Sequence, residues 1–492
     1  MKKNIKINEK DNVIVALENI KAEEIIEGIT IKQDIPSGHK IALTTIDIGE
    51  DIIKYGHSIG HATKKIESGE WVHTGNLKTN LSDIIDYKYI SKIEEKKNCL
   101  EDKKVNIYRR WNGDIGIRNE LWIIPTVGCV NGIAKLAVEE FKIENDISKI
   151  DGINVLTHEY GCSQMGEDHE NTKKILQDLV KHPNAGGVII LGLGCENNQI
   201  GAFKESLGDY NIERTKFLIA QEVEDEVKEL KKLLKDLYEK MKNDKRVLGK
   251  LSEINFGLEC GGSDGFSGIT ANPMLGEFSD YVIGNGGTTV LTEVPEMFGA
   301  ETLLMERCEN EEVFQKTVKL INDFKDFFKK HNQVIYENPS PGNKKGGIST
   351  LEDKSLGCTQ KSGTTKVVDV LMYGERIKKK GLNLLSAPGN DLVATSALGA
   401  ANCHMVLFTT GRGNPYGGFI PTVKISTNSQ LGNTKKRWID FDSGRLISEE
   451  LTMNELLKEF INYIVEVVNG KKCNNELNNF KNLAILKTGV TL

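Results

Sequence analysis

The sequence predicts an α/β protein in which a small β-domain is followed by two α/β domains, the last of them built on a parallel sheet. Three observations support this fold class. Residues 1–83 contain short alternating runs, apolar runs alternate with helical segments beyond residue 120, and a second series of apolar runs starts near residue 254. Strands that alternate with helices are typical of parallel sheets. With 492 residues, the chain is also too long for a single hydrophobic core.

The first domain, residues 1–83, is predicted to consist of short strands. Alternating runs separated by turn residues cover residues 12–17, 29–33 and 40–43. His73 is the candidate for chemistry here, and the alternative is a hydrogen-bonded histidine at a strand end. His57 and His61 are interpreted as two unrelated surface residues, because neighbouring glycines disfavour the helix on which they would share a face.

A charged segment over residues 84–105 is predicted to be a solvated linker. The middle domain, residues 106–250, then repeats one unit three times. Apolar runs at 121–127, 153–157 and 187–193 are each followed by a Gly-Cys turn, at Cys129, Cys162 and Cys195. Helical segments separate the runs, so the unit is typical of a parallel sheet. Since ligands of such sheets bind at the carboxyl ends of the strands, we expect the turns to converge on one rim.

The C-terminal domain, residues 251–492, is predicted to contain a second parallel sheet. Its strands are expected at 254–258, 288–291, 367–372, 382–385 and 405–409, with helices over 300–330 and 391–401. A glycine-rich turn over residues 258–273 follows the first of these strands. Its cysteine, Cys260, is interpreted as a packed residue.

The side chains at these strand ends are of mixed chemistry. They include carboxylates, cations, amides and hydroxyls, among them Asp264, Glu293, Glu296, Asp391, Lys361 and Arg412. Such a set suits a small, hydroxylated, anionic substrate held with a divalent ion. No phosphate-binding glycine fingerprint follows a strand, so a nucleotide cofactor is disfavoured. Cysteines on three separate loops would alternatively bind an iron–sulfur cluster, but the close Cys-x-x-Cys spacings are absent, which disfavours it.

The overall composition excludes some classes of partner. The 64 basic and 70 acidic residues give a net charge of −6 without a basic block, which disfavours nucleic acid as a partner. No apolar run approaches the roughly 20 residues of a membrane helix. Nine cysteines without a secretion signal indicate reduced thiols. We therefore expect a cytoplasmic protein that does not bind membranes.

Several long motifs resemble one family, the altronate dehydratases (UxaA family, within the altronate/galactarate dehydratase superfamily). They are Tyr-Arg-Arg at 108–110, Gly-Ile-Arg-Asn at 116–119, Tyr-Gly-Cys-Ser-Gln at 160–164, Gly-Leu-Gly-Cys-Glu-Asn-Asn at 192–198, Glu-Cys-Gly-Gly-Ser-Asp-Gly at 259–265, Thr-Glu-Val-Pro-Glu at 292–296 and Gly-Cys-Thr-Gln-Lys at 357–361. The resemblance implies a β-clip (SAF) domain, a middle domain and a Rossmann-like C-terminal domain without a dinucleotide. It also implies a homodimer that requires Fe²⁺ or Mn²⁺ and dehydrates D-altronate to 2-dehydro-3-deoxy-D-gluconate in hexuronate (galacturonate) catabolism. The family's usual His-x-His-Asn motif is here His73-Thr74-Gly75-Asn76, which lacks the second histidine.

Roles can be hypothesised from the strand-end positions. We expect Glu293, Asp391 and His404 to contribute to the metal site and His73 or Lys361 to act as an acid–base group. His404 is alternatively a buried structural residue. Substrate binding is assigned to Ser263, Asp264, Asn390 and Arg412. The rival functions are dehydration of galactarate, elimination of sulfite from sulfolactate, and binding of a sugar acid without catalysis.

Overall fold

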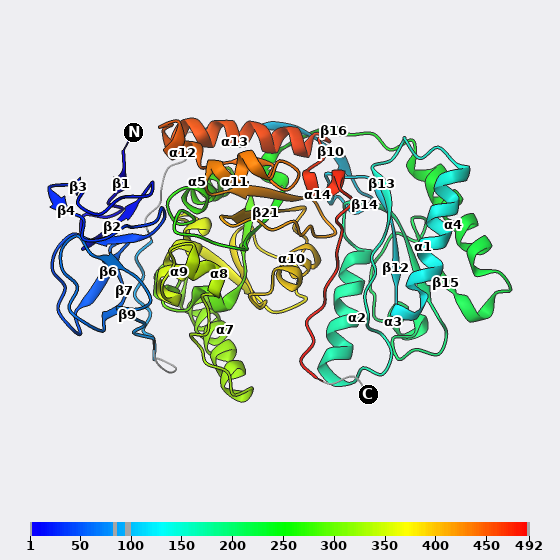
Figure 1. Ribbon diagram of the computed structural model, residues 1–492. Coiled ribbons are helices and arrows are strands. Elements are labelled where there is room, and N and C mark those ends of the chain that lie inside the picture. Colours follow the sequence, from blue (N-terminus) through cyan, green and yellow to red (C-terminus); the bar gives the residue numbers. More distant parts are fainter. Residues whose placement is uncertain (1, 82–85, 94–99, 490–492) are drawn as a thin grey trace.

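The computed structural model describes residues 2–81, 86–93 and 100–489, and its chain forms three parts (Figure 1). A β-rich N-terminal domain and a middle α/β domain lie on opposite sides of the C-terminal α/β domain. Cys99 and parts of the predicted linker lie outside the described residues. Within the described parts, no helix is both long and apolar enough to cross a membrane.

The N-terminal domain is made of short antiparallel strands, as the sequence predicts. One sheet has the order β1-β2-β5-β8, a second has the order β6-β7-β9, and β3 pairs with β4. Their bounds are β1 (Asn4–Ile5), β2 (Val13–Ala16), β3 (Ile25–Ile26), β4 (Ile29–Thr30), β5 (Lys40–Ala42), β6 (Asp51–Lys54), β7 (His57–Ala62), β8 (Trp71–Val72) and β9 (Leu77–Lys78). Two small clusters of isoleucine, valine and alanine form the core.

The middle domain contains a parallel sheet with the order β13-β12-β14-β15. The strands are β12 (Glu120–Pro125), β13 (Gly152–Val155), β14 (Ala185–Gly192) and β15 (Thr215–Ile219). One face packs against α1 (Asn131–Glu144) and α4 (Glu226–Met241), and the other against α2 (Gly166–Val180) and α3 (Ile200–Glu205). The three strands expected from the Gly-Cys pattern, with a helix between each two, are therefore present, and β15 adds a fourth strand.

A small antiparallel sheet marks the start and the end of this domain. The strand β10 (Lys104–Arg109) pairs with β11 (Ile115–Gly116) and with β16 (Val247–Lys250). Since β10 begins at Lys104, the last residues of the predicted linker belong to a sheet rather than to a solvated connection.

The C-terminal domain has seven parallel strands in the order β19-β20-β18-β17-β21-β22-β23. They are β17 (Asn255–Cys260), β18 (Thr288–Leu291), β19 (Val367–Leu371), β20 (Gly381–Leu385), β21 (Met405–Thr410), β22 (Thr422–Ser426) and β23 (Phe441–Asp442). The helices are α5 (Ala271–Gly284), α6 (Glu301–Met305), α7 (Glu311–Lys330), α8 (Pro341–Lys345), α9 (Leu351–Cys358), α10 (Asp391–Ala400), α11 (Ser429–Thr434), α12 (Arg445–Ser448), α13 (Met453–Val468) and α14 (Asn474–Leu477). The helix expected over 300–330 is thus two helices.

At the central strand β17 the order in which the chain adds strands to the sheet reverses. The chain runs from β17 to β18 on one side and later returns to β21 on the other. Phe256 and Leu258 lie in the core that α5 and α13 share, whereas Gly257 faces α10, where an added Cβ would lie 2.9 Å from Leu398. The two helices therefore cover opposite faces of β17. In open α/β sheets such a reversal leaves a crevice at the carboxyl ends of the strands.

Both other domains are fixed to the C-terminal domain by buried contacts. One continuous apolar cluster includes Trp122 and Leu176 of the middle domain together with Leu398 and Phe408. The N-terminal domain instead docks on α9, where the buried carboxylate of Asp353 accepts hydrogen bonds from two lysines of β5 and β6.

Candidate active site

Three carboxylates meet at the carboxyl end of β17. Oxygen atoms of Glu259, Glu293 and Asp391 all lie within 4.8 Å of one another. Glu259 and Glu293 are buried, and Asp391 is half-buried at the start of α10. The structure thus brings together two of the three predicted metal ligands, and it adds Glu259.

The surrounding backbone and side chains hold each carboxylate in place. Glu259 lies on the α10 face of β17 and accepts a hydrogen bond from the hydroxyl of Thr395. Glu293 follows β18 in the left-handed conformation, with φ 65°, and its Oε2 accepts a hydrogen bond of 2.9 Å from the backbone N–H of Cys260. A left-handed glutamate is uncommon, and such strain is concentrated at functional sites.

The electrostatics of these carboxylates favour a bound cation. Burial and the charges of Glu293 and Asp391 raise the pKa of Glu259 well above its usual value. Burial and the charge of Glu296 raise the pKa of Glu293 to about 8 and that of Asp391 to about 6. One oxygen each of Glu259 and Glu293 is buried without a hydrogen-bond partner. Oxygen donors of this kind fit a divalent cation such as Fe²⁺ or Mn²⁺, which would satisfy the unpaired oxygens.

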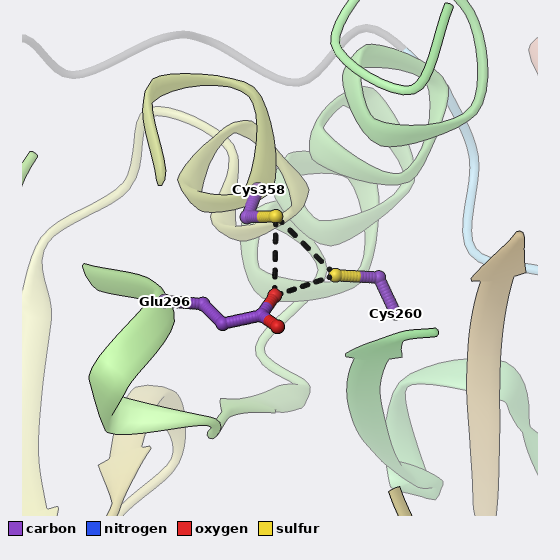
Figure 2. A group of neighbouring side chains, drawn as sticks. All are labelled: Cys260, Glu296 and Cys358. Atoms are coloured by element: carbon purple, nitrogen blue, oxygen red, sulfur yellow. Dashed lines mark hydrogen bonds between the residues drawn. The ribbon is translucent and has the colours of Figure 1, made fainter. Parts of the chain in front are cut away.

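A second group lies on the other face of β17 and contains two thiols (Figure 2). The sulfur atoms of Cys260 and Cys358 are 3.3 Å apart, and they lie 3.2 Å and 3.3 Å from Oε2 of Glu296. Lys354 donates a hydrogen bond of 2.6 Å to the other oxygen of Glu296. Burial alone would raise the pKa of Glu296, but Lys354 and Lys361 hold it below its usual value. Cys260 is therefore part of a polar group as well as packed.

Lys361 lies between the two groups. It belongs to the short 3₁₀ helix η5 (Thr359–Ser362), and its ammonium is 3.3 Å from Oε2 of Glu293. Burial lowers its pKa, but Cys260 and Glu293 outweigh this and raise it well above the usual value. Lys361 therefore forms an ion pair with Glu293. The structure thus places Lys361, which the sequence predicts as an acid–base group, in the site.

A further cation, Lys424 of β22, was missed at the sequence level. Its side chain is buried, its ammonium lies 3.4 Å from the centre of the Phe408 ring, and it has no hydrogen-bond partner among the described residues. Burial lowers its pKa to about 8, although Glu259 and Asp391 act in the opposite direction. A buried lysine with a pKa near neutrality is suited to proton transfer.

The third predicted metal ligand, His404, does not lie in the site. It precedes β21, at the end of the sheet opposite the carboxylates. Both ring nitrogens are already used: Nδ1 accepts from the backbone N–H of Asn255, and Nε2 contacts the carbonyl of Ile115 at 2.7 Å. Its role is structural, which is the alternative that the sequence left open.

Three of the predicted substrate-binding residues have local structural roles. The carboxylate of Asp264 accepts hydrogen bonds from Ser267, Phe266, Thr427 and Asn428. Ser263 is buried and its carbonyl accepts from Asn343, and Asn390 caps the N-terminus of α10. The Asp264 carboxylate, the Ser263 carbonyl and Oδ1 of Asn390 thus stabilise the turns around the site.

Arg412 and His73 remain available to a ligand. Arg412 is exposed, makes no ion pair with the described residues, and lines a cavity of about 530 Å³ together with Lys345. His73 is half-buried beside Trp71, and burial with the charges of Lys64 and Lys40 lowers its pKa. No hydrogen bond or ion pair joins His73 to the carboxylates within the described residues. Nothing in the geometry therefore connects His73 to the metal site directly.

The residues missed at the sequence level have two explanations. Lys424 lies within a strand, whereas the prediction considered the turns beyond the strands, and Glu259 was given to the glycine-rich turn although it belongs to β17. Cys358 also follows a glycine, but it is the last residue of α9 rather than part of a turn after a strand. The Gly-Cys turns also do not form one rim with Cys260, since Cys129, Cys162 and Cys195 lie on the middle sheet.

The fold and the site define a three-domain α/β protein in which three carboxylates that fit a divalent cation meet at the carboxyl end of the central strand. Comparison with known protein families gives matches to each of the three domains. Residues 2–80 match the altronate/galactarate dehydratase SAF domain, residues 107–242 match the second domain of D-galactarate dehydratase/altronate hydrolase, and residues 251–491 match the D-galactarate/altronate dehydratase C-terminal domain. The chain therefore belongs to the altronate/galactarate dehydratase family.

Individual relatives are similar over the full length. The altronate dehydratase of Escherichia coli strain K12 is 60% identical over 99% of both chains, and that of Bacillus subtilis strain 168 is 58% identical over 100% of both. The galactarate dehydratase (L-threo-forming) of Escherichia coli strain K12 is 31% identical over 95% of this chain and 93% of its own.

Proposed function

We propose that this protein is a hydro-lyase that dehydrates D-altronate to 2-dehydro-3-deoxy-D-gluconate. The observation that carries the proposal is the identity of 58–60%, over essentially the whole chain, with two proteins named altronate dehydratase. The relative that acts on galactarate is only 31% identical, which favours altronate as the substrate. The proposal places the protein in the breakdown of hexuronates.

The carboxylates Glu259, Glu293 and Asp391 would hold the metal ion, for which we propose Fe²⁺ or Mn²⁺. When bound, the ion would stabilise the negative charge that develops on the substrate carboxylate as the C2 proton leaves. Lys361 orients Glu293 through their contact of 3.3 Å and favours its ionised form against the effect of burial. Arg412 supplies a cation for the substrate carboxylate at the rim of the cavity.

We propose Lys424 as the base that takes the C2 proton. Its neutral form is accessible because its pKa is about 8, and its amine has no other partner among the described residues. Lys361, whose pKa is raised, is a poorer base. His73 remains the candidate for the acid that protonates the departing C3 hydroxyl.

The metal assignment is tested by replacing the carboxylates one at a time. We expect Glu259→Gln and Asp391→Asn each to lower the affinity for Mn²⁺ at least tenfold, equivalent to about 1.4 kcal/mol, and to lower turnover of D-altronate in parallel. Asp264→Asn is the matched control, because its carboxylate is buried nearby but used by the turn. Unchanged metal affinity in both site variants would contradict the assignment. Galactarate and sulfolactate, assayed beside altronate, test the choice of substrate.

The assignment of the base is tested with Lys424→Met. We expect turnover to fall by about 10²–10⁴-fold, the usual contribution of a general base, while metal affinity stays close to that of the wild type. Lys471→Met is the control, because Lys471 also lies over an aromatic ring but is exposed. If Lys424→Met keeps wild-type turnover, Lys424 is not the base.

A further inference from the structure

Three exposed thiols lie at the carboxyl end of the middle sheet. Cys129 follows β12, Cys162 follows β13 and Cys195 follows β14, and all three are free and exposed. These strands are neighbours, with β12 between the other two. The cysteines therefore leave the sheet at the same edge. None of them belongs to the carboxylate site or to the neighbouring group that contains Cys260 and Cys358.

Hydrogen bonds tie the three turns together beside the cysteines. The N–H of Gly128 donates to the carbonyl of Tyr160 at 2.9 Å, and the N–H of Asn198 donates to the carbonyl of Gly161 at 3.2 Å. The N–H of Ser163 donates to the side chain of Asn197 at 2.8 Å. Each bond links a residue within three positions of one cysteine to the turn that carries another. The thiols thus belong to one connected surface.

The glycine before two of these cysteines has a steric reason. A Cβ added at Gly161 would lie 2.1 Å from the carbonyl oxygen of Thr126, and one added at Gly128 would lie 2.8 Å from that of His158. Gly161 also has φ 102°, a conformation that favours glycine. The glycines allow the turns to approach one another, and the residue that follows each of them is a thiol.

Each of the three turns also carries a polar atom without a partner. Oδ1 of Asn131, Nε2 of Gln164 and Oδ1 of Asn198 are buried, and they make no hydrogen bond within the described residues. Each lies two or three residues after one of the cysteines. Buried polar groups are normally paired, so each of these turns has an atom open to a further partner.

The number and arrangement of the thiols favour one kind of cofactor. A zinc ion with Zn–S bonds of 2.3 Å requires sulfur atoms about 3.8 Å apart. The three sulfurs are not among the groups of described residues whose donor atoms all lie within 4.8 Å of one another. A four-iron cluster, in contrast, needs its thiolate ligands farther apart, because each thiolate binds a different iron atom. We propose that Cys129, Cys162 and Cys195 bind a [4Fe–4S] cluster, one iron of which has no cysteine ligand.

The absence of close Cys-x-x-Cys spacings does not exclude such a cluster. The close Cys-x-x-Cys pattern is expected when one loop supplies several ligands, but here each of three strands supplies one. The proposed cluster is also distinct from the carboxylate metal site. Its presence can therefore be tested without any measurement of dehydration.

The test begins with the full-length protein, purified without oxygen and reconstituted with ferrous iron and sulfide. We expect four acid-labile sulfides per chain and about four iron atoms beyond any ion at the carboxylate site, with the broad absorption near 400 nm of a four-iron cluster. Ferricyanide, by taking one electron from the cluster and releasing the iron that lacks a cysteine ligand as Fe²⁺, should leave a paramagnetic [3Fe–4S] cluster. Cys129→Ser, Cys162→Ser and Cys195→Ser should each abolish the absorption, whereas Cys403→Ala, at a buried thiol elsewhere, should retain it.

A second measurement does not depend on the variants. In the reconstituted wild type, Cys129, Cys162 and Cys195 should be protected from iodoacetamide, and removal of iron by a chelator should make them reactive. The proposal is overturned if no labile sulfide is retained, if the absorption survives in the triple serine variant, if the three thiols react equally with and without the cluster, or if the protein takes up one zinc ion there instead.

Discussion

A methyl group added at Gly261 would lie 2.4 Å from Oδ2 of Asp391 and 2.4 Å from Cζ of Phe408. Real Cβ atoms do not approach other atoms so closely, and Phe408 is fully buried. The absence of a side chain at Gly261 is therefore what allows α10 to bring its first carboxylate against β17. The glycine-rich turn serves the site by leaving room rather than by binding a ligand itself.

We expect Gly261→Ala to displace Asp391 and to weaken Mn²⁺ binding about tenfold, equivalent to about 1.4 kcal/mol. Overpacking against Phe408 should lower the free energy of unfolding by about 1–3 kcal/mol. Calorimetric titration and thermal unfolding measure the two effects. Gly132→Ala is the control, because Gly132 lies in α1 with open space around its Cβ position. It should be neutral or stabilising by up to about 1 kcal/mol.

At the scale of elements, α9 connects the N-terminal domain to the site. Near its start, Asp353 accepts hydrogen bonds from Lys40 at 2.8 Å and from Lys54 at 2.9 Å, and all three side chains are buried. Burial would raise the pKa of Asp353, but the two lysines hold it well below its usual value. At its other end, α9 carries Cys358. The position of the N-terminal domain is thereby coupled to the thiol group.

Asp353→Asn would leave two buried lysines without a counter-charge. Removing one partner of a buried ion pair costs about 3–5 kcal/mol, so we expect a marked fall in the thermal midpoint. We also expect proteolysis of the N-terminal domain to become faster. Asp47→Asn is the matched control, since Asp47 forms an exposed pair with Lys65 at 3.9 Å and should contribute less than about 1 kcal/mol. Equal effects of the two substitutions would show that the buried pair does not hold the domain.

Much of this architecture could be predicted from local patterns. The parallel strands β17, β18 and β21 coincide with apolar runs, and the Gly-Cys turns mark the ends of β12 and β14. The linker was predicted too long, because β10 becomes a strand only by pairing with β16, more than a hundred residues later. The site shows the same limit of local patterns, since Glu259 was not predicted to belong to it and His404 was predicted wrongly. Long-range contacts decide which end of a strand lies at the crevice and on which face of the sheet a side chain lies. A local sequence pattern does not contain these contacts.

At the scale of the whole molecule, Arg118 joins the middle domain to the C-terminal helices. This buried guanidinium pairs with Glu476 at 2.7 Å and donates to the carbonyls of Val467 and Lys471. Burial would raise the pKa of Glu476, but Arg118 lowers it to about 2. Because the folded pKa lies below the unfolded value of about 4.3, the pair contributes stability above pH 4.3 that is lost as the pH falls towards 2.

We therefore expect Glu476→Gln to destabilise the protein by about 3 kcal/mol at pH 7, with a difference from the wild type that shrinks between pH 5 and pH 3. Urea unfolding at pH 7, 5 and 3 measures this dependence. Glu466→Gln removes an exposed pair with Lys471 and should change stability by less than about 1 kcal/mol at every pH. A deficit for Glu476→Gln that stays constant with pH would contradict the assigned pairing.

The alternation of side chains along β17 has a consequence for engineering. Glu259 and Cys260 are neighbours in the chain, yet one faces oxygen donors and the other faces sulfur donors, because successive residues of a strand point to opposite sides. Inserting or deleting one residue before them would turn the carboxylate towards the sulfur donors and the thiol towards the oxygen donors. The metal preference of this pocket can thus be redesigned by substitution at a fixed register, but not by changing the length of the strand.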